Sequence, residues 1–177
     1  MVFAIIDTNV LVSYFISKDD GPPTWVVRNA LGGMITPVFS SYLLNEYRKV
    51  LIREKFNIRY SSVISMIDAF LSFGFGIEMI DSMAALPDKD DTPIYEIALS
   101  TRDIDSYLVT GNTNHFPKDD FVVTPKEFMD ILKNKYRLES EQFDLLNAEY
   151  RNGLSSANDE KDWIPLSEVR KRYGGSK

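Results

Sequence analysis

The stretch that decides the fold is MVFAIIDTNV, residues 1–10. Residues 2–6 are apolar on both faces of an extended chain, which is typical of a central strand in a parallel sheet covered on both sides. The run ends at Asp7, and Thr8 and Asn9 follow it. This order suits a helix cap, so a helix is expected to start here. A carboxylate at the carboxyl end of a parallel strand also lies where α/β sheets bind ligands. Asp7 therefore has two interpretations, a helix cap and a site residue.

Outside this stretch, apolar runs of strand length alternate with amphipathic runs of helix length. Further strands are expected at 34–40, 77–80, 106–111 and 121–123. Helices are expected at 9–15, 24–31, after a capping Ser40 or Ser41, within 61–75 with a stop near Gly74, and at 94–102 and 125–136. The alternation predicts a three-layer α/β/α sandwich with a central parallel sheet over residues 1–136. Residues 137–177 have fewer core candidates and are predicted to form a short helical C-terminal extension.

Composition narrows the function classes. The 177 residues contain no cysteine and one histidine, which excludes disulfides and zinc sites built from several Cys or His. The net charge of −6 argues against a passive nucleic-acid binder, which usually carries an excess of Lys and Arg. An acidic chain can still act on phosphates when its carboxylates first bind divalent cations. The N-terminus lacks signal-peptide features and no apolar run suits a membrane span, so the cytoplasm is the expected location.

Four polar side chains are expected to converge at one edge of the sheet. Asp7 ends the first strand, and Asn112 follows the strand at 106–111. Asp91 opens a later helix, and Glu46 borders the apolar stripe of the helix after Ser40. Carboxyl ends of parallel strands share one edge, so these groups can meet there. Clustered acids point to Mg²⁺ or Mn²⁺, hard ions that take oxygen ligands and activate water for hydrolysis of phosphate esters.

Each of these residues also has a structural interpretation. Asp91 can cap the helix that it opens, and Asn112 is a common turn residue. Glu46 can pair with a neighbouring base on its own helix. His115, three residues after Asn112, is expected to be a turn or packing residue rather than a metal ligand. The joint placement of the four candidates favours a site.

The motifs around these residues resemble the PIN domain. They are DTN at 7–9, SSYLLNEYRKVL at 40–51, LPDKDDTPIYEIAL at 86–99 and YLVTGNTNHF at 107–116. The sequence looks most like the prokaryotic PIN-family toxins related to the VapC group, over roughly residues 2–130. The resemblance implies a metal-dependent ribonuclease built on a parallel sheet flanked by helices.

The resemblance also implies roles for individual residues. Asp7, Glu46 and Asp91 match the metal-binding catalytic acids of the family. Asn112 stands where many members have a fourth acid, and its amide oxygen can ligate a metal without bringing charge. The supporting hydrogen-bonding positions are Thr8, Asn9 and Thr110.

The leading hypothesis is a Mg²⁺- or Mn²⁺-dependent endoribonuclease, a toxin that a partner antitoxin protein neutralises. Homodimers are common among similar proteins, and no membrane partner is expected. The alternative is a catalytically weak PIN-like module for nucleic-acid binding or regulation, which Asn112 and the acidic pI favour.

A third hypothesis, a phosphatase of the haloacid dehalogenase type, is disfavoured. That chemistry needs a second acid two residues after the first, and Asn9 occupies that position. Basic residues on and after the Glu46 helix are expected either to bind RNA or to form a solvated face; they are Arg48, Lys49, Arg53, Lys55 and Arg59.

The tail carries one further pattern. DWIPLSEVRKRYG, residues 162–174, resembles the short helical segments of some small antitoxins. It is interpreted either as a segment that docks on the domain or a partner subunit, or as a loosely packed C-terminal helix.

Overall fold

The computed structural model describes residues 2–78 and 91–136. The chain divides into two compact units, residues 1–129 and residues 130–177, and the sheet belongs to the first. The predicted extension at 137–177 lies outside the described residues, as do Asp88 and Asp90 of the acidic loop. The domain boundary at residue 136 stays a prediction.

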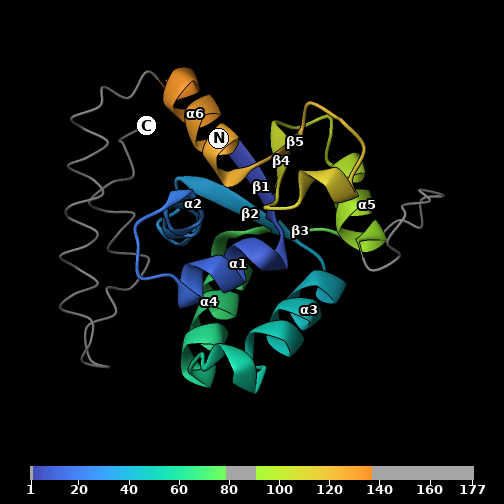
Figure 1. The fold of residues 1–177 in the computed structure, drawn as a ribbon. Coiled ribbons are helices and arrows are strands. Elements are labelled where there is room, and N and C mark those ends of the chain that lie inside the picture. Colours follow the sequence, from blue (N-terminus) through green and yellow to red (C-terminus); the bar gives the residue numbers. More distant parts are fainter. Residues whose placement is uncertain (1, 79–90, 137–177) are drawn as a thin grey trace. The chain divides into compact units, whose positions relative to one another are not determined.

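Five parallel strands form one sheet in the order β3-β2-β1-β4-β5 (Figure 1). Central β1 pairs with β2 on one side, where Ile5 lies opposite Val38, and with β4 on the other, where Ile5 lies opposite Leu108. This position explains why residues 2–6 are apolar on both faces, and it confirms the predicted central strand. The strands are β1 (Val2–Ile6), β2 (Ile35–Phe39), β3 (Phe75–Gly76), β4 (Ser106–Val109) and β5 (Val122–Val123).

Helices cover both faces of the sheet, which confirms the predicted α/β/α sandwich. Helix α1 contacts α2 and α3, helix α4 contacts α2, α3 and β2, and helix α5 packs against β1 and β4. No helix within the described ranges is long and apolar enough to cross a membrane. The helices are α1 (Thr8–Ile16), α2 (Pro22–Leu31), α3 (Ser41–Leu51), α4 (Tyr60–Phe73), α5 (Thr92–Ser100) and α6 (Pro125–Tyr136), with 3₁₀ turns η1 (Glu54–Phe56) and η2 (Thr113–His115).

Capping residues fix where the helices begin. The Ser40 hydroxyl accepts a 3.2 Å hydrogen bond from the Leu43 N–H and so starts α3, which selects Ser40 from the two predicted caps. Prolines occupy the first two positions of α2, where the missing N–H costs nothing. The start of α3 matters most for function, because it sets the position of Glu46.

The third strand lies two residues earlier than predicted. Helix α4 ends at Phe73, in agreement with the predicted stop near Gly74, whereas the strand is Phe75–Gly76 and the expected strand at 77–80 is misplaced at residues 77 and 78, which the structure describes. The cause is Gly74, where a Cβ would lie 2.5 Å from the Phe70 carbonyl oxygen and 2.7 Å from that of Pro37. Only glycine permits so close an approach, and it turns the chain from helix into sheet there.

Candidate functional site

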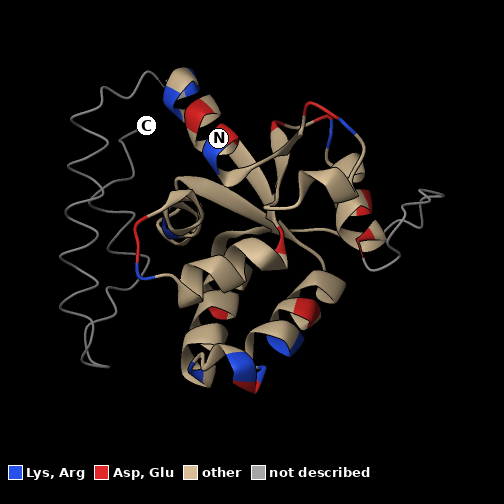
Figure 2. Ribbon diagram, viewed as in Figure 1, with Lys and Arg blue, Asp and Glu red and all other residues tan. Residues whose placement is uncertain are grey.

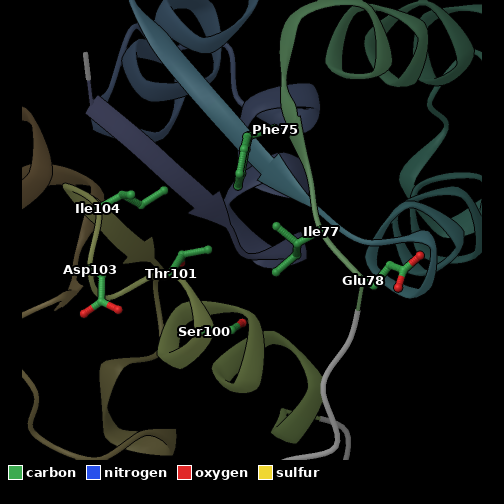
Figure 3. Close-up of a pocket in the computed structure, with 7 residues that line it drawn as sticks. All are labelled: Phe75, Ile77, Glu78, Ser100, Thr101, Asp103 and Ile104. Atoms are coloured by element: carbon green, nitrogen blue, oxygen red, sulfur yellow. The ribbon is translucent and has the colours of Figure 1, made fainter.

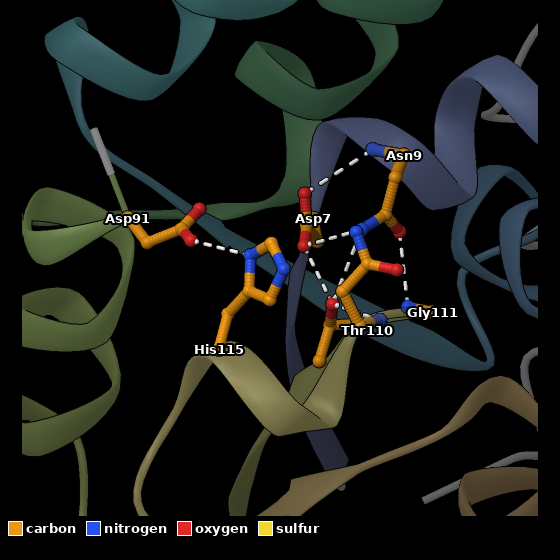
Figure 4. A network of polar contacts seen from close by, with 7 residues as sticks. Asp7, Asn9, Asp91, Thr110, Gly111 and His115 are labelled. Atoms are coloured by element: carbon orange, nitrogen blue, oxygen red, sulfur yellow. Dashed lines mark hydrogen bonds and ion pairs between the residues drawn. The ribbon is translucent and has the colours of Figure 1, made fainter. Parts of the chain in front are cut away.

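Asp7 lies at the carboxyl end of β1 and caps the first turn of α1 (Figure 4). Its Oδ1 accepts a hydrogen bond of 3.2 Å from the backbone N–H of Asn9. Burial raises the pKa of Asp7 above its ordinary value, because the charged carboxylate is disfavoured away from water. The helix-cap interpretation is therefore right for one oxygen, and the other oxygen belongs to a polar network.

That network joins the loops that follow β1 and β4. The hydroxyl of the fully buried Thr110 donates to Asp7 Oδ2 at 2.6 Å, and Asn9 Nδ2 donates to the same oxygen at 2.8 Å. The Gly111 N–H in turn donates to Asn9 Oδ1 at 3.0 Å. The hydrogen bond from Thr110 lowers the pKa of Asp7 and so opposes the effect of burial. Two predicted supporting residues, Asn9 and Thr110, thus contact Asp7 directly (Figure 4).

Helix α3 is hydrogen-bonded to the two residues that flank Asp7 at the carboxyl end of β1. The hydroxyl of the buried Thr8 donates to Glu46 Oε1 at 2.5 Å. One residue further along α3, the buried Tyr47 hydroxyl donates to the carbonyl oxygen of Ile6. Glu46 therefore lies beside the neighbour of Asp7, as expected for a residue on the border of the apolar stripe.

Asp91 stands at the start of α5, but it does not cap that helix. Its side chain makes no capping hydrogen bond. Instead, Asp91 Oδ2 lies 2.9 Å from Nδ1 of His115, which comes from η2 (Figure 4). The negative charge of Asp91 contributes to the raised pKa of Asp7, after the larger effect of burial, and His115 lowers that pKa. His115 was predicted to be a turn or packing residue, and the structure adds its direct contact with a predicted site residue.

Asn112 begins η2 and is exposed. Its backbone N–H donates to the Thr110 hydroxyl at 3.0 Å, which ties the η2 loop to the network around Asp7. Within residues 2–78 and 91–136, no three Asp, Glu or His side chains are grouped closely enough to hold one ion. The structure therefore brings Asp91 into contact with His115 and Glu46 into contact with Thr8, without gathering the predicted acids around a single point.

The donor set at this edge still fits a hard divalent cation. Asp7, Glu46 and Asp91 supply carboxylate oxygens and Asn112 an amide oxygen, and these are the ligand types that such ions prefer. Mg²⁺ typically uses one or two protein carboxylates and keeps several of its waters, so it does not require three acids in direct contact.

The basic residues after Glu46 lie on the surface. Arg48, Lys49 and Arg53 are exposed, and positive charge gathers at the carboxyl end of α3 and in the turn before α4 (Figure 2). The Lys55 ammonium lies 4.8 Å from the centre of the Phe56 ring, a cation–π contact. Arg48 and Lys49 lie on α3, two and three residues after Glu46.

A cavity of about 290 Å³ lies apart from these residues. Side chains beside β3 face side chains at the end of α5 across it (Figure 3). None of the predicted site residues lines it; the lining residues are Phe75, Ile77, Glu78, Ser100, Thr101, Asp103 and Ile104. The polar network at the carboxyl end of β1 is therefore the better candidate site, because chemistry-bearing groups converge there.

A family model described as PIN domain matches residues 4–114, more than half of the chain. The matched range contains Asp7, Glu46, Asp91 and Asn112. No curated protein and no solved structure gives a significant match. The chain therefore belongs to the PIN-domain family, whose members are generally nucleases.

Proposed function

We propose that this protein is a metal-dependent endoribonuclease that hydrolyses RNA phosphodiester bonds. Asp7, Glu46 and Asp91 would hold Mg²⁺ or Mn²⁺, and Asn112 would help to place the ion or the attacking water. The observation that carries the proposal is the buried Asp7 carboxylate at the carboxyl end of the central strand, hydrogen-bonded to Thr110 and Asn9, in a chain of the PIN family. A carboxylate shielded from water at such an edge is stabilised when it binds a cation.

The residues around the acids have defined tasks in this proposal. When bound, the ion supplies an activated water and neutralises charge on the phosphate. Thr110 and Asn9 hold the Asp7 carboxylate in one orientation through hydrogen bonds of 2.6 and 2.8 Å to Oδ2. Thr8 holds Glu46 in the same manner. Such outer contacts orient ligands and are needed for tight metal binding.

Two substitutions at the acids test the proposal. Asp7→Asn and Asp91→Asn should each lower the Mn²⁺-dependent cleavage of an unstructured RNA by about 100-fold or more, because several kcal/mol of charge stabilisation is lost. Asp103→Asn is the matched control, since Asp103 is an exposed acid outside the polar network. Cleavage by Asp7→Asn at the wild-type rate would contradict the proposal. A single-stranded DNA of the same sequence, assayed in parallel, tests the preference for RNA.

The position of Glu46 on α3 favours Lys49 over the adjacent Arg48 as a residue that contacts RNA. Residues three or four apart on a helix are neighbours on its surface, whereas residues two apart point away from each other. Lys49 is three residues after Glu46 and Arg48 is two after it, and both are exposed. We therefore infer that Lys49 lies on the path of the RNA backbone to the site and that Arg48 points away.

This inference is tested by RNA binding with Asp7→Asn as the background, which avoids cleavage. Lys49→Ala should weaken binding of a short RNA and reduce the slope of log K against log salt by about 1, because one phosphate contact is lost. Arg48→Ala is the matched control and should change neither quantity. Equal effects of the two substitutions would favour a diffuse, solvated basic face.

A binding or regulatory module remains the second candidate function, and Asn112 favours it. An amide in place of a fourth acid brings no charge to the metal. Calorimetry separates the two candidates: RNA binding without any Mn²⁺ binding at millimolar metal would support the module and oppose the enzyme.

We further infer that the protein is a cytoplasmic toxin with an antitoxin partner, from its likeness to VapC-group PIN proteins. Induced expression in a bacterial host should then stop growth, and Asp7→Asn should abolish that effect. Growth arrest by both proteins would contradict a catalytic toxin. A homodimer and a docking role for residues 152–177 stay predictions, which light scattering of the full chain and of a chain ending at residue 151 can test.

A further inference from the structure

We propose that His115 is a positioning residue that fixes the carboxylate of Asp91 at the candidate metal centre. The inference rests on the proposed function, and it assigns a task to the only histidine of the chain. His115 Nδ1 lies 2.9 Å from Asp91 Oδ2, across 24 residues of sequence. A carboxylate accepts hydrogen bonds, so the tautomer that this contact requires carries its proton on Nδ1.

Asp91 needs such a partner because its own helix does not hold it. An aspartate at a helix start usually bonds a backbone N–H of the first turn, and Asp91 makes no such hydrogen bond. Its contact with His115 uses Oδ2 and leaves Oδ1 available to a cation. The carboxylate is thereby limited to one orientation, as is usual for metal ligands whose second oxygen is hydrogen-bonded to an outer residue.

Neighbouring aromatic residues hold the histidine at the correct distance from α5. Phe116 follows His115 and is buried, and its ring centre lies 6.1 Å from that of Tyr95. Tyr95 is one helical turn after Asp91, so these two residues lie on the same side of α5. The adjacent residues His115 and Phe116 contact them in turn, His115 at Asp91 and Phe116 at Tyr95. The Tyr95 hydroxyl also donates to Asp119, which fastens the same loop a second time. The His115–Asp91 contact is therefore a built feature of the loop.

Two other roles for His115 make different predictions. An ordinary ion pair between partly exposed groups contributes little free energy and does not orient its carboxylate, so its removal would leave the metal affinity unchanged. A histidine that ligates the metal through Nε2 would not be replaceable by asparagine, whose shorter amide reaches only the position of Nδ1. A positioning residue needs a donor at the Nδ1 position alone.

Calorimetric titration of the full chain with Mn²⁺, without RNA, separates these roles. His115→Ala should weaken Mn²⁺ binding by about 10-fold or more, and His115→Asn should restore it to within about 3-fold of wild type. Asn114→Ala is the matched control, because Asn114 is exposed and precedes His115 in the same 3₁₀ turn. This variant should bind Mn²⁺ with the wild-type affinity. Circular dichroism should give the same melting temperature for all four proteins, because the contact is partly exposed.

The outcomes distinguish this inference from the proposed function. Equal Mn²⁺ affinity of His115→Ala and wild type overturns the positioning role and leaves the nuclease proposal intact. Equal weakening by His115→Ala and His115→Asn overturns it in favour of direct ligation. A wild-type chain that binds no Mn²⁺ overturns the metal-dependent function, and the role of His115 with it.

Discussion

At the scale of single residues, Asp7 combines two tasks that the sequence offered as alternatives. One oxygen accepts from the Asn9 N–H and starts α1, and the other accepts from the Thr110 hydroxyl. Burial raises the pKa of Asp7, while the hydrogen bond from Thr110 lowers it. The hydrogen bonds from Thr110 and Asn9 therefore make a partly buried charge tolerable at the end of β1.

A double-mutant cycle should reveal this coupling. Asp7→Ala, Thr110→Val and the double variant should give a coupling free energy of about 1.5–3 kcal/mol, the usual range for a hydrogen bond to a charged group. Urea unfolding followed by circular dichroism measures it. Asp7→Ala with Thr101→Val is the control cycle, since the Thr101 hydroxyl contacts the amino end of β4 through Ser106. If the coupling free energy between Asp7 and Thr110 is no larger than that between Asp7 and Thr101, the hydrogen bond from Thr110 to Asp7 does not stabilise the fold.

At the scale of elements, α6 begins with a capping box that the sequence TPKE encodes. The Thr124 N–H and hydroxyl each donate to Glu127 Oε2 at 2.8 Å, and the Glu127 N–H donates back to the Thr124 hydroxyl at 3.2 Å. The backbone hydrogen bond, with that from the hydroxyl, lowers the pKa of Glu127 below its ordinary value. This reciprocal pair fixes the first turn of the helix after β5.

The capping box should make stability depend on pH in a defined direction. A glutamate whose folded pKa lies below its unfolded pKa stabilises the fold above the unfolded value, and this stabilisation is lost as the pH falls through the folded value. Glu127→Gln keeps the hydrogen-bonding geometry but does not titrate. Between pH 6 and pH 3, the wild type should therefore lose more unfolding free energy than Glu127→Gln. Thr124→Ala should abolish the difference; parallel pH curves with Thr124 present would contradict the prediction.

At the scale of the whole molecule, the parallel strand order assembles the site from distant segments. Central β1 brings Asp7 to the same edge as the loop after β4, and α3 and α5 bring Glu46 and Asp91 to it. The outer strand β3 extends the sheet only because Gly74 lets the chain pass the end of α4 and the backbone of β2. Topology thus depends on one glycine far from the site.

Gly74→Ala should therefore destabilise the domain. The added Cβ would lie within 3.0 Å of the Phe70 and Pro37 carbonyl oxygens and the Phe39 ring, and such overpacking costs about 1–3 kcal/mol or more. Gly21→Ala is the control, because its Cβ would meet nothing nearer than 3.8 Å, and it should cost about 0.5 kcal/mol or less. Chemical denaturation measures both. Equal stability of the two variants would contradict the role assigned to Gly74.

Much of the fold was predictable because its determinants are local. The apolar run at 2–6 predicts a central strand, the pair Ser40 and Ser41 predicts the start of α3 to within one residue, and the Thr-Pro step at 124–125 predicts the start of α6. The third strand was misplaced, since the close approach at Gly74 involves Pro37 and Phe39, which are distant in sequence. Periodicity alone does not report such contacts.

For the candidate site, the sequence by itself determined the chemistry: which residues carry carboxylates, and that Asp7 ends a buried strand. Only the tertiary structure decided which side chains contact each other. In it, Asp91 contacts His115, Glu46 accepts a hydrogen bond from Thr8, and Asp7 accepts one from Thr110. The physical reason is range: capping and burial patterns act over a few residues, whereas these hydrogen bonds join groups 24 to 103 residues apart, which only the packing of the sheet and its helices brings together.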